Sequence, residues 1–324
     1  MLLFLAFCNF LFFYLLTLKG GLFVKVPLTF LFVLFSFLFK MNIDVIDMPD
    51  YDSYYRVIGL VNPEMSFKML FAEPYYFQFV NYLYKNNSAE YSINFFYYVN
   101  YFATVVFFVW IAFLKDISAW KKMLLFALYY HLFAFVLLRN TPSYVLVGFL
   151  FYYLHKEKYL KISLLSFMGH LSSLPILFFA FFKNKLGDKK LLALSVLFFF
   201  AFNIILQLPF LGVYEKFSGY QEGDEYGKSL FHKIYFLLFL IVNTYLFFKD
   251  KRLFFNYTYT FTFLTYLVLQ FASPVMGYRF SIYLVIYLML SPHLKFEVET
   301  ERNLNLFSPV LFFLFLISYM SIFT

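Results

Sequence analysis

Long apolar runs separated by short polar stretches follow one another along the whole chain. A run of about 20 apolar residues can cross the ~30 Å hydrocarbon core of a bilayer as an α-helix. The pattern therefore predicts an all-α polytopic integral membrane protein with about ten or eleven transmembrane helices, in one domain covering residues 1–324. The expected spans are residues 2–18, 22–39, 91–114, 120–138, 141–155, 191–211, 230–248, 253–272, 275–292 and 306–323.

One further apolar segment, residues 160–182, has lysines on both sides. Basic residues mark the cytoplasmic ends of spans, so both of its ends are expected on that side. Its middle, "GHLSSLP" (169–175), is a poor continuous helix because it combines glycine, serine and proline. We expect a re-entrant pair of half-helices with His170 near the turn, and a single kinked span is the alternative.

The longest polar segment, residues 40–90, carries seven acidic residues and four Lys or Arg. A loop this poor in positive charge is expected on the outer face of the membrane. Prolines interrupt it, and residues 51–60 and 75–85 are each expected to form a short amphipathic helix at the interface.

Composition supports a membrane protein and excludes several other classes. The chain is 63% hydrophobic and 14% charged, whereas soluble domains carry about 25% charged residues. Its single cysteine, Cys8, excludes an intrachain disulfide. The net charge of +8 comes largely from loop lysines that orient the spans, so no nucleic-acid partner is expected. We find no nucleotide-binding or zinc motif and expect neither a cofactor nor a metal. The alternative is a metal ion coordinated by the carboxylates of the acidic island at 44–52.

Charged residues are costly inside a bilayer, so the few that occur at the ends of the spans are the best guide to function. Arg139 and Arg279 each lie near the expected outer end of a span. The planar guanidinium fork suits phosphate oxygens, so these two residues are candidates for binding a diphosphate. The alternative is that each side chain snorkels to the interface or pairs with an acidic residue.

An acidic island and one histidine supply candidate catalytic residues. Asp44, Asp47, Asp50 and Asp52 lie within nine residues of one another at the mouth of the second span. Glycosyl transfer needs a base for the acceptor hydroxyl or a charge that stabilises the oxocarbenium-like sugar. Asp47 and Asp50 are the preferred candidates because they flank Pro49, and His170 is a further candidate base or phosphate ligand. A solvated acidic loop and a structural histidine are the alternatives.

Three more residues are candidates for substrate binding. Glu73 precedes Pro74 and either complements the positive end of a helix or binds the acceptor. Tyr51 and Tyr54 could stack on sugar faces, although a single tyrosine at this depth is more often part of the interfacial aromatic belt.

Five short motifs follow one another along the polytopic frame. They are "DYDSY" (50–54), "EPYY" (73–76), "LRN" (138–140), "MGHLSS" (168–173) and the late arginine in "SPVMGYRFSIYL" (273–284). In this order and on such a frame, the motifs resemble those of the EpsG/Wzy-type polysaccharide polymerases of bacterial envelopes. Asn140 departs from the glutamine usual in the third motif.

The resemblance implies a glycosyltransferase that polymerises O-antigen or capsule repeat units at the outer face of the bacterial inner membrane. Donor and acceptor would be undecaprenyl-diphosphate-linked oligosaccharides, and the growing chain would move onto the non-reducing end of a new unit. A chain-length regulator, a flippase and membrane lipid would be its partners. The alternatives are another lipid-linked membrane glycosyltransferase, an O-acyltransferase, or a polysaccharide transporter or flippase.

Overall fold

A computed structural model describes most of the chain, and all regular secondary structure in the described residues is helical. These residues form two compact units, which are considered separately below. Unit 1 comprises Met1–Val145, Met168–His170 and Met289–Thr324, and unit 2 comprises Leu146–Phe167 and Leu171–Leu288. The described residues are 1–48, 51, 52, 54, 55, 74–158, 160–186, 190, 193, 197, 230–249, 257–272, 274–292 and 294–323.

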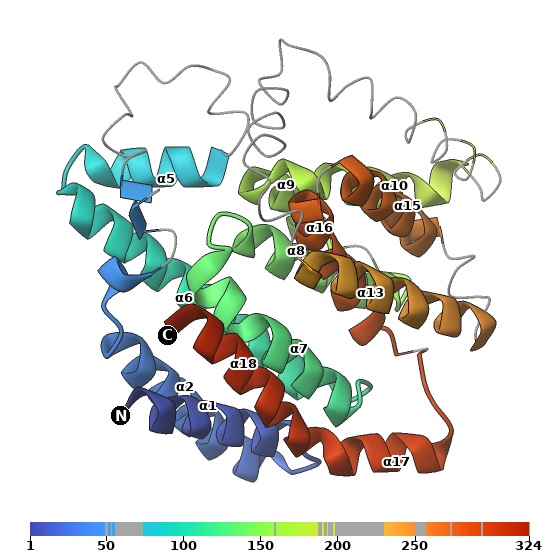
Figure 1. Cartoon of the computed structure of the whole chain (residues 1–324), viewed down its shortest axis with the longest axis horizontal. Coiled ribbons are helices and arrows are strands. Elements are labelled where there is room, and N and C mark those ends of the chain that lie inside the picture. Colours follow the sequence, from blue (N-terminus) through green and yellow to red (C-terminus); the bar gives the residue numbers. More distant parts are fainter. Residues whose placement is uncertain are drawn as a thin grey trace. The chain divides into compact units, whose positions relative to one another are not determined.

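Unit 1 is a helical bundle with an aromatic core. Phe13, Phe126 and Phe315 stack in series, with ring centroids 4.0 Å apart for the first pair and 5.3 Å apart for the second. These rings join α1, α7 and α18, which lie side by side in Figure 1. The elements of unit 1 are α1 (Leu2–Thr17), α2 (Leu22–Met41), η1 (Val45–Asp47), α5 (Pro74–Tyr84), α6 (Ala89–Phe113), α7 (Ala119–His131), η2 (Leu132–Val136), the start of α8 (Thr141–Leu154), α17 (Val298–Phe307), η6 (Ser308–Val310) and α18 (Leu311–Phe323).

A buried network of neutral polar groups ties four helices of unit 1 together. Ser36 of α2 donates a hydrogen bond to the amide oxygen of Asn9 on α1, at 3.0 Å. The Tyr130 hydroxyl of α7 donates to Ser36 Oγ at 3.0 Å, and the Tyr101 hydroxyl of α6 donates to the Ser36 carbonyl oxygen at 2.6 Å. The two tyrosine hydroxyls lie 2.8 Å apart. Buried polar groups need such partners, so the network fixes the register of these helices.

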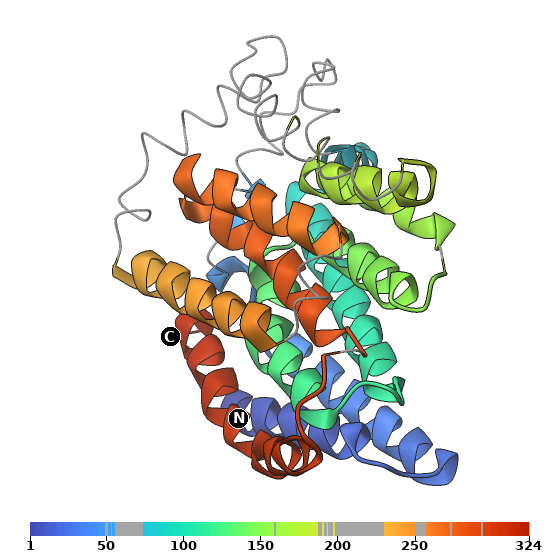
Figure 2. The ribbon, with the colours of Figure 1, turned by 90° about the vertical axis from the view of Figure 1, so that its right-hand side faces the viewer.

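Unit 2 is built from the rest of α8, a broken helical segment and three longer helices. α13 (Leu230–Lys249), α15 (Tyr257–Ala272) and α16 (Pro274–Met289) lie side by side (Figure 2). Aromatic pairs join them, with ring centroids 4.7 Å apart for Phe239 and Tyr266 and 5.0 Å apart for Tyr235 and Tyr278. A Cβ atom on Gly277 would lie 2.6 Å from Gln270 Cα, so glycine permits the close approach of α15 and α16.

The expectation of an all-helical membrane protein is confirmed for the described residues by their secondary structure and by the length and composition of their apolar helices. Three helices of the described residues, Leu22–Met41, Ala89–Phe113 and Val298–Phe323, are long and apolar enough to cross a bilayer. Shorter apolar helices lie at Leu2–Thr17, Thr141–Leu154 and Pro274–Met289. The full number of crossings and the extent of a single domain stay predictions, and the span expected at 191–211 lies outside the continuously described residues.

The broken character of the segment at 160–182 is confirmed. Short helices η3 (Lys161–Leu165), α9 (Ser166–Gly169) and η4 (Leu171–Ser173) precede a longer helix, α10 (Leu174–Leu186). His170 lies at the break between α9 and η4. The re-entrant path of this segment stays a prediction, as does the alternative of a single kinked span. Residues 75–85, expected to form a short helix, correspond to α5.

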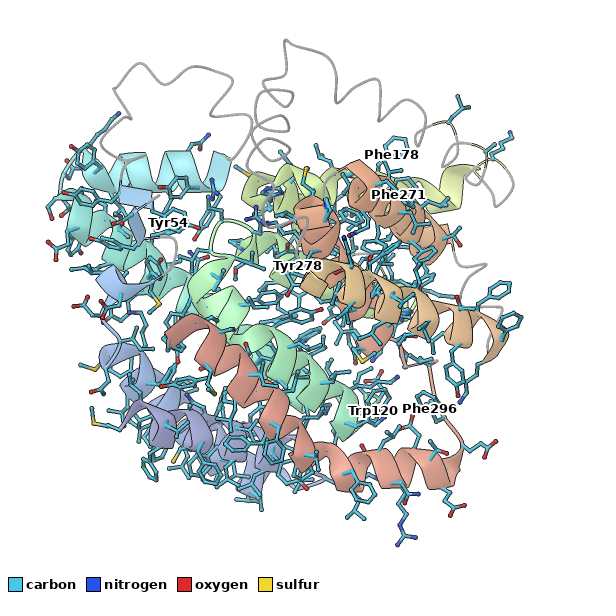
Figure 3. The ribbon with its side chains drawn as sticks, in the orientation of Figure 1. Tyr54, Trp120, Phe178, Phe271, Tyr278 and Phe296 are labelled. Carbon is cyan, nitrogen blue, oxygen red and sulfur yellow. The ribbon has the colours of Figure 1, made fainter. Side chains whose placement is uncertain are left out.

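The structure adds a helix that the sequence pattern did not predict. The last expected span begins at residue 306, but α17 already begins at Val298. Trp120 of α7 anchors this helix, because its indole N–H donates to Glu301 Oε2 at 2.9 Å and its backbone N–H donates to Asn305 Oδ1 at 3.0 Å. The Trp120 ring also lies near Phe296, with 5.8 Å between the ring centroids (Figure 3).

Candidate functional site

Arg139 lies against two tyrosines that come from different motifs. Its guanidinium carbon is 5.5 Å from the ring centroid of Tyr54 and 5.8 Å from that of Tyr76. Both distances fall within the ~6 Å range of cation–π attraction. The first three sequence motifs therefore meet in unit 1, at what we call the arginine cluster: Tyr54, Tyr76 and Arg139 (Tyr54 is labelled in Figure 3).

A wall of aromatic rings on α6 supports the arginine cluster. The Tyr54 ring centroid lies 5.9 Å from that of Phe96 and 6.2 Å from that of Tyr97. The Tyr76 ring is 5.3 Å from both Tyr54 and Phe96, and its hydroxyl donates to the Tyr54 carbonyl oxygen at 3.2 Å. Tyr54 and Tyr76 are buried, whereas Arg139 is partly exposed. The cluster thus holds one partly exposed cation against an apolar wall.

An unusual turn positions Arg139 between α7 and α8. α7 continues into a π-helical turn, η2, in which the Leu137 N–H donates to the Leu132 carbonyl oxygen at 2.7 Å. The single proton of the Thr141 hydroxyl is shared between two carbonyl oxygens of the turn, those of Phe133 at 2.8 Å and Leu137 at 3.0 Å. π-turns occur often at functional sites. Thr141 is fully buried, so this side chain fixes the turn that carries Arg139.

The fourth motif reaches the same region through a glycine. A Cβ atom on Gly169 would lie 2.9 Å from the Ser143 backbone nitrogen and 3.4 Å from Pro142 Cβ. Only glycine permits this approach without a shift of the first turn of α8. His170 follows Gly169 directly in sequence and is partly exposed.

Asp44 and Asp47 of the acidic island are both exposed, and Asp44 also has a structural role. Asp44 caps η1, because its Oδ1 accepts a hydrogen bond from the Ile46 N–H at 3.1 Å. Asp47 is exposed at the end of η1, and no contact joins it to the arginine cluster in the described part of the chain. Asp50 and Glu73 lie outside the described residues, so their roles stay predictions.

Tyr51 is buried rather than exposed for stacking. Its ring stacks on that of Tyr55, with 6.0 Å between the centroids. Burial raises the pKa of the Tyr51 hydroxyl, and the nearby Glu90 carboxylate raises this pKa further. Tyr51 is therefore a neutral hydroxyl at physiological pH, and its expected role in sugar stacking stays a prediction.

Arg279 belongs to unit 2, where it lies on α16. Tyr283, one turn further along the same helix, is fully buried, and its hydroxyl lies 3.0 Å from Ser172 Oγ of the fourth motif. The fourth and fifth motifs are therefore joined within unit 2. The shared role expected for Arg279 and Arg139 stays a prediction.

Sequence reasoning missed two groups that shape this site. Phe96 supports both tyrosines, but it is one of many phenylalanines in an apolar span and nothing in its pattern distinguishes it. Thr141 could have been noticed as a small hydroxyl residue directly after the "LRN" motif. Among the described residues, no group of three or more His, Cys, Asp or Glu side chains could hold a metal ion.

These features define a helical membrane protein with an arginine held on an aromatic wall. The profile of the EpsG family matches residues 23–324, which is most of the chain, and the chain belongs to this family. At the level of the family, membership implies a membrane polysaccharide polymerase. Comparisons with curated proteins and with solved structures gave no match.

Proposed function

We propose that the protein polymerises oligosaccharide repeat units carried on undecaprenyl diphosphate, as a multi-pass protein at the outer face of the bacterial inner membrane. The observation that carries the proposal is the arginine cluster, in which tyrosines of two motifs lie against the partly exposed guanidinium of a third motif. A guanidinium can bind two phosphate oxygens at once, which suits the diphosphate of a lipid carrier.

The reaction needs a charged leaving group and a nucleophile. The acceptor hydroxyl oxygen attacks the anomeric carbon of the growing chain, and the bond from that carbon to the diphosphate oxygen breaks. The diphosphate leaves with the bonding electrons, and the hydroxyl proton passes to a base. Arg139 stabilises the charge that develops on the diphosphate. Because the donor is already activated, the reaction consumes no nucleotide.

The candidate bases are Asp47, Asp50 and His170. Their support differs: His170 directly follows Gly169, which approaches the Ser143 backbone nitrogen in the first turn of α8, whereas Asp47 is exposed on η1. A base has to come within hydrogen-bond distance of the acceptor hydroxyl in the bound complex. We therefore expect His170 to be more important than Asp47, and mutagenesis can rank both against Asp50.

A deletion of the gene, complemented with variants, tests the function. The strain is complemented with wild type, Asp47→Ala, Asp50→Ala or His170→Ala, and surface polysaccharide is separated on a gel with membrane protein levels checked. Loss of the ladder with single repeat units still attached establishes a polymerase. Loss of the single unit as well indicates a flippase or an earlier transferase. An unchanged ladder with altered acetyl content indicates an O-acyltransferase.

A further inference from the structure

A second polar site lies in unit 1, at the end of α2. A pocket of about 300 Å³ is lined there by residues of α2, η1 and α6. Its volume is at the lower end of the ~300–1,000 Å³ range of small-molecule pockets. The residues that carry the argument are Lys40, Asp44, Tyr91, Asn94, Phe95 and Tyr98, which we call the lysine pocket.

The lysine pocket contains a buried cation that is held in place. Lys40 is only 2% exposed, and its ammonium nitrogen lies 4.4 Å from the ring centroid of Tyr98. Asp44 lines the same pocket, and the hydrogen bond to the Ile46 N–H fixes its carboxylate. A buried charge is costly, so a lysine at this position calls for a functional reason.

Aromatic rings form the other side of the lysine pocket. Tyr91, Phe95 and Tyr98 follow one another at helical spacing on α6, and all three are exposed by more than a third. The rings of Tyr91 and Phe95 are stacked, with 6.2 Å between the centroids and 17° between the planes. Asn94, between them in sequence, adds an amide that both donates and accepts hydrogen bonds.

We propose that the lysine pocket binds a sugar ring of the lipid-linked saccharide, an inference that rests on the proposed function. A pyranose has an apolar face that suits an aromatic ring, and hydroxyls that suit an ammonium, an amide and a carboxylate. An anionic headgroup fits less well, because the fixed carboxylate of Asp44 would repel it. An acyl chain fits least well, because it would leave the buried ammonium of Lys40 without a polar partner.

Neighbouring residues of α6 contact the lysine pocket and the arginine cluster. Tyr97 contacts Tyr54 of the arginine cluster, and the next residue, Tyr98, contacts Lys40 of the pocket. The proposal places the diphosphate of the saccharide at Arg139 and one of its sugar rings in the lysine pocket. The pocket is then a subsite that recognises sugar, separate from the group that stabilises the leaving diphosphate.

Site-directed labelling of a single cysteine tests this subsite directly. The only native cysteine, Cys8, is buried and is replaced by serine. Tyr91→Cys places a thiol at the rim of the pocket, and Tyr82→Cys on α5 is the matched exposed control. The full-length protein is placed in phosphatidylcholine nanodiscs and labelled with a maleimide. The probes are the lipid-linked saccharide extracted from the deletion strain, the saccharide released from it by mild acid, and undecaprenyl diphosphate alone.

We expect the released saccharide to protect Tyr91→Cys and not Tyr82→Cys, and undecaprenyl diphosphate to protect neither. Lys40→Met keeps the length of the side chain and removes the ammonium, so it should weaken protection about tenfold through the loss of one charge-assisted hydrogen bond. Lys25→Met, near the other end of α2, should leave protection unchanged.

Two results would overturn the subsite. In the first, undecaprenyl diphosphate or added phosphatidylglycerol protects the Tyr91→Cys thiol as well as the released saccharide does, which would indicate an anion site. In the second, no saccharide protects the Tyr91→Cys thiol although the same preparation still polymerises the lipid-linked units. The second result leaves the proposed function intact. Protection without polymerisation would instead contradict the polymerase and support the sugar subsite.

Discussion

Two polar regions of unit 1 differ in charge and exposure. The network of Asn9, Ser36, Tyr101 and Tyr130 is buried and neutral, and hydrogen bonds link its members to one another. The arginine cluster carries a cation, is partly exposed, and lies at a break between helices. The comparison teaches that polar residues in this apolar chain occur in two settings. Neutral ones are buried and set the register of helices, and the charged Arg139 lies at a helix break where it is partly exposed.

The largest difference between the two regions should appear at Arg139. Arg139→Lys keeps the positive charge but loses the planar fork that binds two phosphate oxygens. We expect the amount of polymer to fall by about 100-fold or more, because removing one donor that stabilises a transition state lowers the reaction rate by about this factor. The check is the polysaccharide ladder at matched protein levels, and a normal ladder would show that only charge is needed there.

Gly169→Ala should be the next most damaging change. The added Cβ would lie 2.9 Å from the Ser143 nitrogen, so the first turn of α8 would have to shift, at a cost of about 1–3 kcal/mol. Gly21→Ala is the control, because no atom lies within 4 Å of its added Cβ. We expect a lower thermal midpoint and less polymer for Gly169→Ala only. Equal effects of the two substitutions would show that the contact at Ser143 is unimportant.

Thr141→Val sharpens the comparison, because it removes a hydroxyl from the turn that carries Arg139. The substitution is close in shape and leaves the Phe133 carbonyl oxygen short of a donor, at a cost of about 1–2 kcal/mol, whereas the Leu137 carbonyl oxygen keeps its backbone donors. We expect polymer to fall with little change in protein level, and Thr141→Ser to restore it. If Thr141→Ser were as defective as Thr141→Val, the methyl group rather than the hydroxyl would be responsible.

Tyr130→Phe should have the smallest effect on function. It removes one hydroxyl from the buried network and should destabilise the fold by about 1 kcal/mol. Thermal unfolding measures the loss, and the polysaccharide ladder should stay normal. A ladder lost at normal protein level would mean that the neutral network also takes part in function.

The sequence pattern predicted the helices far better than it predicted the site. Apolar runs are local signals, so α2 and α6 were expected close to where they lie. The meeting of Tyr54, Tyr76 and Arg139 depends on the packing of α5 and η2 against α6, which no local pattern records. α17 was missed because its charged first turn resembles a loop, and the Trp120 contacts that anchor it are distant in sequence.

The most direct test of the account is binding of undecaprenyl diphosphate without sugar to the purified protein in phosphatidylcholine nanodiscs. The comparison is between wild type, Arg139→Gln and Tyr130→Phe. The account predicts that wild type and Tyr130→Phe bind alike and that Arg139→Gln binds at least about tenfold more weakly, because it loses the charge-assisted contacts to the diphosphate. Equal binding by all three proteins would contradict the claim that the arginine cluster holds the diphosphate.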